Sequence, residues 1–537
     1  MRPKTNPPIA WGLLIFLGIF AAELAFGIYL SVYRGFVYND AVSRVANAFY
    51  MLYSRDPHLG AIGFVWNPLP SLLELGPLLL WPWIPAVATA GLAANIITAL
   101  FAAGSAALLF RFSRENTGSA GLSLALTAGY SLNPFIFLYG ANGMSEAMFA
   151  FFIMWSVMLF LKWMKEDLSV YPIATGLALA AAFWIRYEAV AFGIGLVLAV
   201  FAVTLESRTG LGRPGRLEPA RERRFKIEST MIVILTPAVF SGVAWIVLNA
   251  IIMGDPLYFF RSGYSNLAFS GNLTDEFLRL IETPAGALWL VLRKSAFFAL
   301  PLLAILGVRL LYGRARERDT LALMLLCGSI PAMQFALLLN GSSFGWLRFF
   351  VYPFVIAVVW IPYELSRLRL ARHFRLAAAG LFLSVFLSSF VVLDMNNNEF
   401  SPDEYEVFHI NESGTYKDLT VAREVSRAIN GIIREAGPED KPLILTDSYS
   451  AYSVLLNSRY PRQWVIPTDR DFQDILKDPH AYGVDYILMS EKIGAVLQII
   501  HETYPELFEK GTYWTELVTD FDGKWKLFRV TGSTEIE

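Results

Sequence analysis

The sequence predicts an α-helical polytopic membrane protein with about eleven transmembrane helices and a small α/β domain at its C-terminal end. Of the 537 residues, 55% are hydrophobic and only 17% are charged, whereas about a quarter of the residues in a soluble protein are charged. The apolar residues form long runs up to residue 394, and mixed polar sequence follows. We therefore expect a transmembrane domain at 1–395 and a soluble domain at 396–537.

The transmembrane prediction rests on the length of the apolar runs. A helix needs about 20 apolar residues to cross about 30 Å of hydrocarbon. Runs that reach or approach this length lie near residues 10–33, 86–110, 119–138, 143–162, 168–185, 189–205, 229–253, 286–311, 319–340, 349–366 and 376–394. The fifth and sixth are short, so they are tilted, broken or re-entrant. The first lacks a small-residue cleavage site, and we expect it to remain as an anchor.

The distribution of Lys and Arg predicts the orientation in the membrane. The loop at 206–228 contains seven of these residues, and four other loops on the same side are also basic. The long loop at 34–85, on the opposite side, contains only Arg34, Arg44 and Arg55. Because basic loops favour the cytoplasm, we expect a cytoplasmic N-terminus in the plasma membrane and an extracytoplasmic C-terminal domain.

The C-terminal segment alternates between strand and helix patterns. Strands are expected at 443–446, 464–466 and 486–489, helices at 449–457, 470–478 and 494–504, and a hairpin turn at Asp522-Gly523. This order predicts a small α/β domain with a largely parallel sheet. The triplet Asp469-Arg470-Asp471 resembles a nucleotide-sugar metal motif, but acidic residues are also favoured at a helix start. We predict no metal site.

The first loop after the first span contains the strongest catalytic candidate, Asp40. A carboxylate at the membrane surface can act as a general base toward an acceptor hydroxyl, with Asn39 beside it and Arg44 one helical turn later. The alternative is that the Asn-Asp pair caps a helix. The segment at 36–56 is amphipathic and is expected to lie along the interface.

Other polar residues of the predicted outer side are candidates for substrate binding. His58 and Asn67 belong to the first loop, although a single His is more often an ordinary surface residue. Glu146 follows Ser145 at the start of the fourth span. A carboxylate at that depth needs a partner or a water-filled cavity, unless the two residues cap the helix.

Two arginines lie at breaks or mouths of the predicted spans. Arg186 and Glu188 separate the two short spans, and Arg348 precedes the tenth span. Guanidinium groups match phosphate oxygens in a bidentate arrangement. The alternative for Arg186 and Glu188 is that both side chains extend to the interface without a specific partner.

Together these motifs resemble the GT-C superfamily of polytopic glycosyltransferases, which includes protein O-mannosyltransferases and aminoarabinose transferases. The matching features are Asp40, the segment from Trp66 to Pro70, the Ser-Glu pair at 145–146, Arg186-Tyr187-Glu188, and Arg348 before an aromatic-rich span. They extend over residues 10–394. Protein O-mannosyltransferases often have Asp-Glu where this chain has Asn39-Asp40, so the acceptor class remains open.

The resemblance implies an inverting transfer of a sugar from a polyprenyl-phosphate donor to a lipid, glycan or protein acceptor. Asp40 would be the base, the basic residues Arg44, Arg186 and Arg348 would hold the phosphate, and no cofactor besides the donor would be needed. The expected partners are membrane lipids and the lipid-linked sugar, and no nucleic acid. Further substrate-binding candidates are Asn39, His58, Asn67, Glu146 and Glu188.

A transporter or flippase is the alternative function. Such a protein would also have many spans and a few buried charges. It would be expected to have two hydropathy halves with helix breaks at matching positions, and the sequence shows no such pairing.

Overall fold

The computed structural model describes residues 9–205, 219–368, 372–393, 401–409, 419–437, 440–494 and 497–534. The chain forms two compact units. Unit 1 comprises Met1–Phe26, Thr98–Val247 and Thr274–His409, and unit 2 comprises Gly27–Ile97, Leu248–Leu273 and Ile410–Glu537. The C-terminal segment therefore belongs to the same unit as the first predicted outer loop. The boundary predicted at residue 395 remains a prediction.

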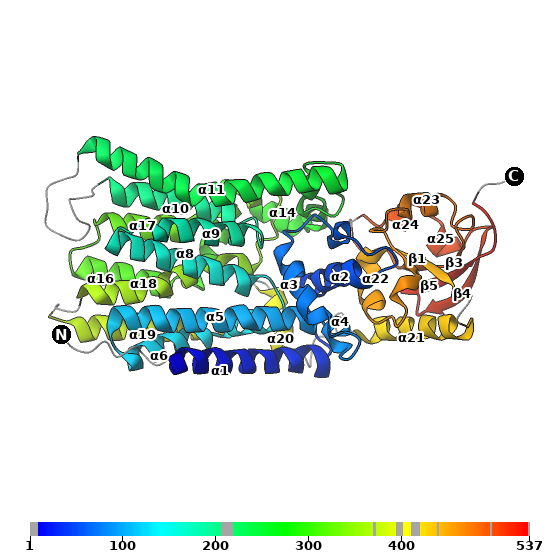
Figure 1. Ribbon diagram of the computed structural model, residues 1–537, viewed down its shortest axis with the longest axis horizontal. Coiled ribbons are helices and arrows are strands. Elements are labelled where there is room, and N and C mark those ends of the chain that lie inside the picture. The colour runs from blue at the N-terminus through cyan, green and yellow to red at the C-terminus, as the bar shows by residue number, and fades with distance from the viewer. Residues whose placement is uncertain are drawn as a thin grey trace. The chain divides into compact units, whose positions relative to one another are not determined.

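Unit 1 is built from long helices that lie side by side (Figure 1). Its main helices are α1 (Ile9–Ile28), α5 (Leu92–Thr117), α6 (Ala120–Ser131), α7 (Pro134–Ala141), α8 (Glu146–Glu166), α9 (Val170–Phe183), α10 (Ala189–Thr204), α11 (Ala220–Met253), α14 (Asp275–Ile281), α15 (Pro284–Ala296), α16 (Leu300–Leu311), α17 (Arg318–Leu339), α18 (Tyr352–Leu368), α19 (Phe374–Leu393) and α20 (Pro402–Phe408). A short 3-10 turn, η4 (Leu347–Phe350), precedes α18.

Among the described residues, seven helices are long and apolar enough to cross a membrane. Two helix pairs, α6 with α7 and α15 with α16, bend by 68° and 85° and would raise this number to nine if each pair is one span. The two runs expected to be short are α9 and α10. Every predicted run is thus helical, but the count of eleven spans is not confirmed. The apolar helices make this chain an integral membrane protein.

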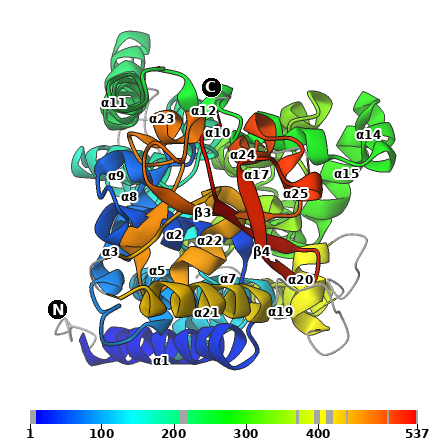
Figure 2. The same cartoon turned by 90° about the vertical axis from the view of Figure 1, so that its right-hand side faces the viewer.

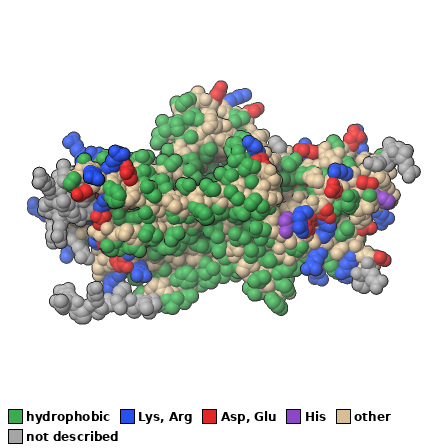
Figure 3. Space-filling model, turned by 45° about the horizontal axis from the view of Figure 1, so that its top comes forward, with side chains coloured by type: hydrophobic (Ala, Val, Ile, Leu, Met, Phe, Trp, Pro, Cys, Tyr) green, Lys and Arg blue, Asp and Glu red, His purple; other side chains and the backbone are tan. Residues whose placement is uncertain are grey.

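The surface of unit 1 fits contact with lipid. On the face shown in Figure 3, hydrophobic side chains form a broad surface over its helices. On α11 the exposed side chains include Ile232, Val239, Phe240 and Val243. Apolar surface of this extent is rare on soluble monomers. Residues 206–218 of the predicted basic loop lie outside the described residues.

The core of unit 1 is centred on α18, of whose most apolar window 89% is buried. Helices α8, α16 and α17 pack against α18, α9 packs against α8, and α10 packs against α17. Gly195 permits the close approach of α10 to α17, because a Cβ there would lie 2.7 Å from the Ser329 side chain. Small residues at such crossings let membrane helices pack closely.

A buried ion-pair network joins α16, α17 and α18 near the C-terminal end of α18. The fully buried Arg309 donates hydrogen bonds to Glu364 at 2.6 Å and to Asp319 at 2.7 Å. Arg314 also binds Glu364, at 2.7 Å, and Arg367 binds Asp319. Arg314 and Arg367 follow predicted spans, in loops of the predicted basic side, and the structure pairs both with carboxylates. This pairing stabilises one arrangement of the three helices.

Unit 2 contains short helices from the first outer loop and a small sheet domain. The loop contributes α2 (Asn39–Tyr53), η2 (Leu59–Ile62) and α3 (Leu69–Leu78), and α4 (Ala86–Thr89) follows at the start of the second predicted span. The segment before residue 273 adds α12 (Tyr258–Arg261), α13 (Asn266–Phe269) and η3 (Ser270–Asn272). The C-terminal part contains α21 (Leu419–Glu435), β1 (Leu443–Thr446), α22 (Ser448–Leu456), η5 (Pro461–Gln463), β2 (Trp464–Val465), α23 (Phe472–Lys477), β3 (Val484–Ser490), α24 (Ile499–Thr503), α25 (Leu507–Lys510), β4 (Thr515–Phe521) and β5 (Trp525–Val530).

The sheet has the strand order β2-β1-β3-β5-β4; its strands β3 and β4 are labelled in Figure 2. Strand β1 is parallel to β2 and β3, whereas β5 is antiparallel to β3 and β4. The predicted strands and helices each have a counterpart, but the sheet is mixed and not largely parallel. The difference comes from the terminal hairpin, whose turn at Asp522 and Gly523 has φ values of 55° and 70°. These values fit a tight hairpin turn.

Candidate functional site

Unit 1 contains a polar cluster in which two predicted arginines share one carboxylate. A guanidinium nitrogen of Arg186 lies 2.6 Å from Oε1 of Glu146, and Nε of Arg348 lies 3.4 Å from the same oxygen. Arg186 also binds Glu188, at 2.6 Å, and the hydroxyl of Ser145, at 3.1 Å. The structure thus brings together Glu146, Arg186, Glu188 and Arg348, which are far apart in the sequence.

Helix ends position these side chains. Glu146 is the first residue of α8, Glu188 is the residue just before α10, and Arg348 belongs to η4. All of these side chains are buried: those of Arg186 and Arg348 are only 11% and 5% exposed. Positive charge near a helix N-terminus is unfavourable by itself, so the carboxylates are needed to hold the two cations there.

The structure decides against two of the alternatives considered for these residues. The side chain of Ser145 makes no capping hydrogen bond to α8; its hydroxyl accepts from Arg186 instead. Arg186 is buried and bound to Glu146 and Glu188, so its side chain does not extend to the interface without a specific partner. These polar residues form one network and are not independent helix ends.

Sequence reasoning missed three ionisable members of this cluster. Asp403, on α20, accepts a hydrogen bond from Arg348, and the buried Glu404 accepts one from the Tyr139 hydroxyl at 2.6 Å. Lys294, on α15, is buried within reach of the charges of both carboxylates. A lysine inside a predicted span is a signal of function and could have been used. Residues 403 and 404 carry no such signal, since they follow the last span.

The two arginines of the cluster are already neutralised by carboxylates, so the cluster has no excess positive charge that would attract an anion. The two arginines bind three carboxylates, Glu146, Glu188 and Asp403. Burial raises the pKa of Glu404 to about 7, and Asp403 adds to this increase, while Tyr139 and Arg348 oppose it. A phosphate that binds here must therefore displace a carboxylate, or a carboxylate of the cluster must be protonated when the phosphate binds.

Unit 2 contains the predicted base. Asn39 and Asp40 are the first two residues of α2, and the N-cap is Tyr38 without a side-chain capping bond, so the capping alternative is not supported. Oδ1 of Asn39 accepts a hydrogen bond of 3.0 Å from the hydroxyl of Tyr452 on α22. Burial raises the pKa values of Tyr449 and Tyr452, and the charge of Asp40 adds to both increases. The two tyrosines therefore lie close to the Asp40 carboxylate.

Aromatic side chains from unit 2 gather around Tyr449. Its ring centroid lies 6.1 Å from that of Tyr264 and 5.9 Å from that of Phe269. No candidate site residue was predicted from the sequence in the C-terminal segment. In the structure it supplies Tyr449 and Tyr452 to the surroundings of Asp40, a relation that no short motif in the sequence reveals.

Arg44 lies in unit 2, whereas Arg186 and Arg348 lie in unit 1. It is buried on α2, and its guanidinium carbon lies 4.8 Å from the ring centroid of Trp66. Burial raises the pKa of the nearby Glu74, and the charge of Arg44 opposes this increase. The role of Arg44 in holding a phosphate remains a prediction.

The two remaining candidates also belong to unit 2. Nδ1 of His58 lies 2.7 Å from the backbone oxygen of Asp56, and Asn67 is buried just before α3. The contact of His58 lies within its own loop and identifies no substrate. Their roles remain predictions.

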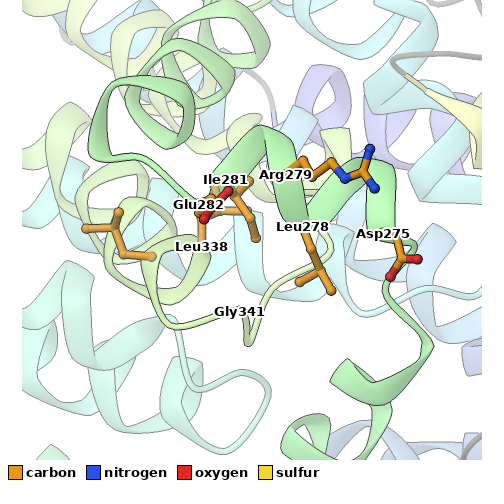
Figure 4. Close-up of a pocket in the computed structure, with 8 residues that line it drawn as sticks. Asp275, Leu278, Arg279, Ile281, Glu282, Leu338 and Gly341 are labelled. Carbon is orange, nitrogen blue, oxygen red and sulfur yellow. The ribbon is translucent and has the colours of Figure 1, made fainter.

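A separate pocket of about 570 Å³ lies in unit 1 between α14 and the end of α17 (Figure 4). Apolar side chains of Leu278, Ile281 and Leu338 line it together with the charged Asp275 and Arg279. None of the predicted site residues lines this pocket, and we assign it no role in the reaction.

No family model matches the sequence, and no curated protein matches it. Among solved structures the chain is similar to the archaeal oligosaccharyltransferase AglB from Archaeoglobus fulgidus, determined in complex with an inhibitory peptide and a dolichol-phosphate. The identity is 13% and the TM-score 0.44, over 98% of this chain and 75% of that chain. It is also similar to the oligosaccharyltransferase of Archaeoglobus fulgidus tethered to an acceptor peptide containing the NVT sequon, with 13% identity and a TM-score of 0.43 over 90% and 69% of the two chains. Neither likeness assigns the chain to a family.

Proposed function

We propose that the chain is an inverting glycosyltransferase of the GT-C type. It would move a sugar from a polyprenyl-phosphate donor to a lipid, glycan or protein acceptor on the extracytoplasmic side of the membrane. The observation that carries this proposal is the convergence of Arg186 and Arg348 on one oxygen of Glu146. Two buried cations held around a single anionic oxygen mark a place where a phosphoryl oxygen can be bound.

The two arginines offer donors suited to an anionic substrate once Glu146 has been displaced. Burying a charge in a membrane protein is costly, and such residues usually serve a substrate or a reaction. Arg186 and Arg348 present several N–H donors in a planar fork that fits phosphate. The start of α8 adds the partial positive charge of a helix N-terminus. A donor phosphate would replace Glu146 as the partner of the two arginines.

The reaction would be a single displacement. The acceptor hydroxyl oxygen attacks the anomeric carbon from the face opposite the phosphate, and the bond between that carbon and the phosphate oxygen breaks with its electron pair on the oxygen. Asp40 takes the hydroxyl proton. The leaving polyprenyl phosphate gains a negative charge, which Arg186 and Arg348 would stabilise. Inversion at the anomeric carbon follows.

The test is transfer by the purified protein in detergent. Radiolabelled polyprenyl-phosphate glucose, mannose and arabinose would be supplied in turn, with host membrane extract as the source of acceptors. We expect label to leave the lipid donor for a second product without any ion gradient. Transport would require sealed vesicles. Absence of transfer with every donor, from protein that remains folded, would contradict the proposed function.

The buried ion-pair network that joins α16, α17 and α18 supplies a matched control. Arg367 is a half-buried arginine that binds the carboxylates Asp319 and Glu317, as Arg186 binds two carboxylates, but it lies outside the proposed donor site. Arg367→Gln should transfer sugar at the wild-type rate, while Arg186→Gln should not.

A further inference from the structure

Two oppositely charged segments of unit 2 bind each other in a reciprocal arrangement, which we call the clasp. Arg55 lies 3.1 Å from Oδ2 of Asp469 and also binds Asp471. In return, Asp56 accepts hydrogen bonds from Nε of Arg470 at 2.8 Å and from its backbone N–H at 3.1 Å. The clasp therefore consists of Arg55, Asp56, Asp469, Arg470 and Asp471.

The order of charges explains why the clasp is specific. An Arg-Asp pair faces an Asp-Arg-Asp triplet, so a shift of one residue would place like charges together. The Asp469 side chain is fully buried, and the side chains of Arg55 and Asp56 are 23% and 20% exposed. The Arg55–Asp469 pair is therefore partly desolvated and stronger than an exposed ion pair, whereas the Arg470 side chain is 72% exposed. The triplet is thus engaged in contacts with Arg55 and Asp56.

The clasp and Tyr452 hold opposite ends of the same helix. Arg55 and Asp56 follow directly after the end of α2 at Tyr53, whereas the Tyr452 hydroxyl binds Asn39 at its beginning. Asp40, the proposed base, is the next residue after Asn39. The C-terminal segment consequently fixes both the position and the rotation of the helix that carries Asp40.

We propose that Tyr452 is a positioning residue for Asp40 and that the clasp locks α2 in the orientation that the reaction needs. This inference rests on the proposed function, because it assigns Asp40 a reaction to perform. It makes the C-terminal segment an integral part of the catalytic unit, and not only a device for acceptor choice.

The docking can be tested without any measurement of activity. The chain has a single cysteine, Cys327, which is buried, so an engineered pair gives an unambiguous crosslink. Asp56→Cys with Arg470→Cys, treated in native membranes with a short bis-maleimide and then nicked by protease, should leave the two fragments joined. The control pair, Asp56→Cys with the exposed Lys524→Cys, should not crosslink. Fragments that separate equally in both cases would overturn the docking.

Charge reversal tests whether the clasp matters for the reaction. Asp56→Arg places two cations together, and Arg470→Asp places four carboxylates together, so each single variant should slow transfer. We expect losses of about 10- to 100-fold, the effect of misplacing a reacting group by about 1 Å. The double variant restores an opposite pair and should recover most of the rate. A double variant no faster than either single variant would contradict the lock.

Tyr452→Phe removes only the hydroxyl and tests the positioning role. We expect kcat to fall and the pH–rate profile to shift, while KM for the donor is unchanged, because the phosphate is bound in unit 1. Tyr513→Phe, which loses a hydroxyl bound to the backbone oxygen of Thr534, is the control. An unaltered kcat and pH profile in Tyr452→Phe would overturn the role. If the wild type transfers sugar from no donor, the proposed function fails, whereas the crosslink still decides the docking.

Discussion

Arg186 and Arg348 contact the same atom, Oε1 of Glu146, at 2.6 and 3.4 Å. Two guanidinium groups repel each other unless an anion offsets their charge, and the Glu146 carboxylate contacts both of them. A phosphate that binds to the two arginines must therefore compete with Glu146 and take its place. The first three predictions follow from this competition and from the placement of Asp40.

Loss of either arginine should weaken donor binding. For Arg186→Ala and Arg348→Ala we expect the Kd of a polyprenyl-phosphate hexose to rise by about 10- to 100-fold, since a hydrogen bond to a charged group contributes about 1.5–3 kcal/mol. Arg→Lys keeps the charge but not the planar fork, so its effect should be smaller. Calorimetry in detergent, with the matching polyprenol as a control ligand, measures the change. Wild-type affinity in both alanine variants would remove these residues from the donor site.

Asp40→Asn should abolish most of the transfer and leave donor binding intact. The substitution preserves shape and removes basicity, and a positioned general base contributes about 10²–10⁴-fold to the rate. The initial rate of label transfer is the measurement, and Asp520→Asn, in the exposed terminal hairpin, serves as the control. If folded Asp40→Asn protein transfers sugar at the wild-type rate, Glu146 and Glu188 become the next carboxylates to test.

Donor affinity should depend on pH through Glu404. Burial raises the pKa of this carboxyl to about 7, and Asp403, Tyr139, Arg348 and Lys294 are the groups that face it. Protonation removes one negative charge from the cluster, so the Kd should decrease as the pH falls below about 7. The donor is a phosphodiester whose single charge is constant in this range, and the change therefore belongs to the protein.

The same shift has a defined effect on stability. Because the folded pKa of Glu404 lies above its ordinary value of 4.5, its contribution is fully present below pH 4.5 and is lost as the pH rises through about 7. Glu404→Gln should have high donor affinity at every pH and a flatter stability profile. A pH-dependent Kd that is unchanged in Glu404→Gln would assign the titration to another group.

The ion-pair network at the end of α18 should be structural. Arg309→Ala leaves Glu364 and Asp319 buried beside an empty space, and removing one partner of a buried pair costs about 3–5 kcal/mol. We expect a large drop in the thermal unfolding temperature in detergent. The exposed Leu310→Ala should have almost none. Equal unfolding temperatures for the two variants would show that the network does not stabilise the helices.

The predicted topology can be tested with protease. In right-side-out vesicles, the C-terminal segment should be digested and the basic loop at 206–228 protected, because basic loops favour the cytoplasm. Digestion in inside-out vesicles should show the opposite pattern. Cleavage of the basic loop from the outside would reverse the orientation and, with it, the side on which the reaction is proposed.

Sequence reasoning reached the helical fold because apolar runs of membrane length leave few other structures. It did not reach the bends of 68° and 85° between α6 and α7 and between α15 and α16, since these depend on packing against other helices. In the site, Glu146 and Arg186 were found because charges stand out in apolar sequence. Asp403 and Glu404 were missed because they lie in polar sequence, where a carboxylate does not stand out from its neighbours.

The clasp illustrates a different limit. Asp469-Arg470-Asp471 was interpreted from its own spacing, as a weak metal motif or a helix start. Its meaning depends on Arg55 and Asp56, more than four hundred positions earlier in the chain. Opposite charges in both segments are visible in the sequence, but no local rule selects this pairing among the many that composition permits.

The burial of α18 has a consequence for motion during turnover. Its residues from Val355 to Ile361 are completely inaccessible to solvent. Arg348, which forms an ion pair with Glu146, lies just before the helix, and Glu364, which forms one with Arg309, lies near its other end. If α18 moved along its axis, the charged contacts at both of its ends would break together. We therefore expect this helix to keep its position during turnover and to have the slowest amide hydrogen exchange in the protein. Substrate entry and release would then depend on peripheral helices such as α1 and α11, of whose most apolar windows only 17% is buried.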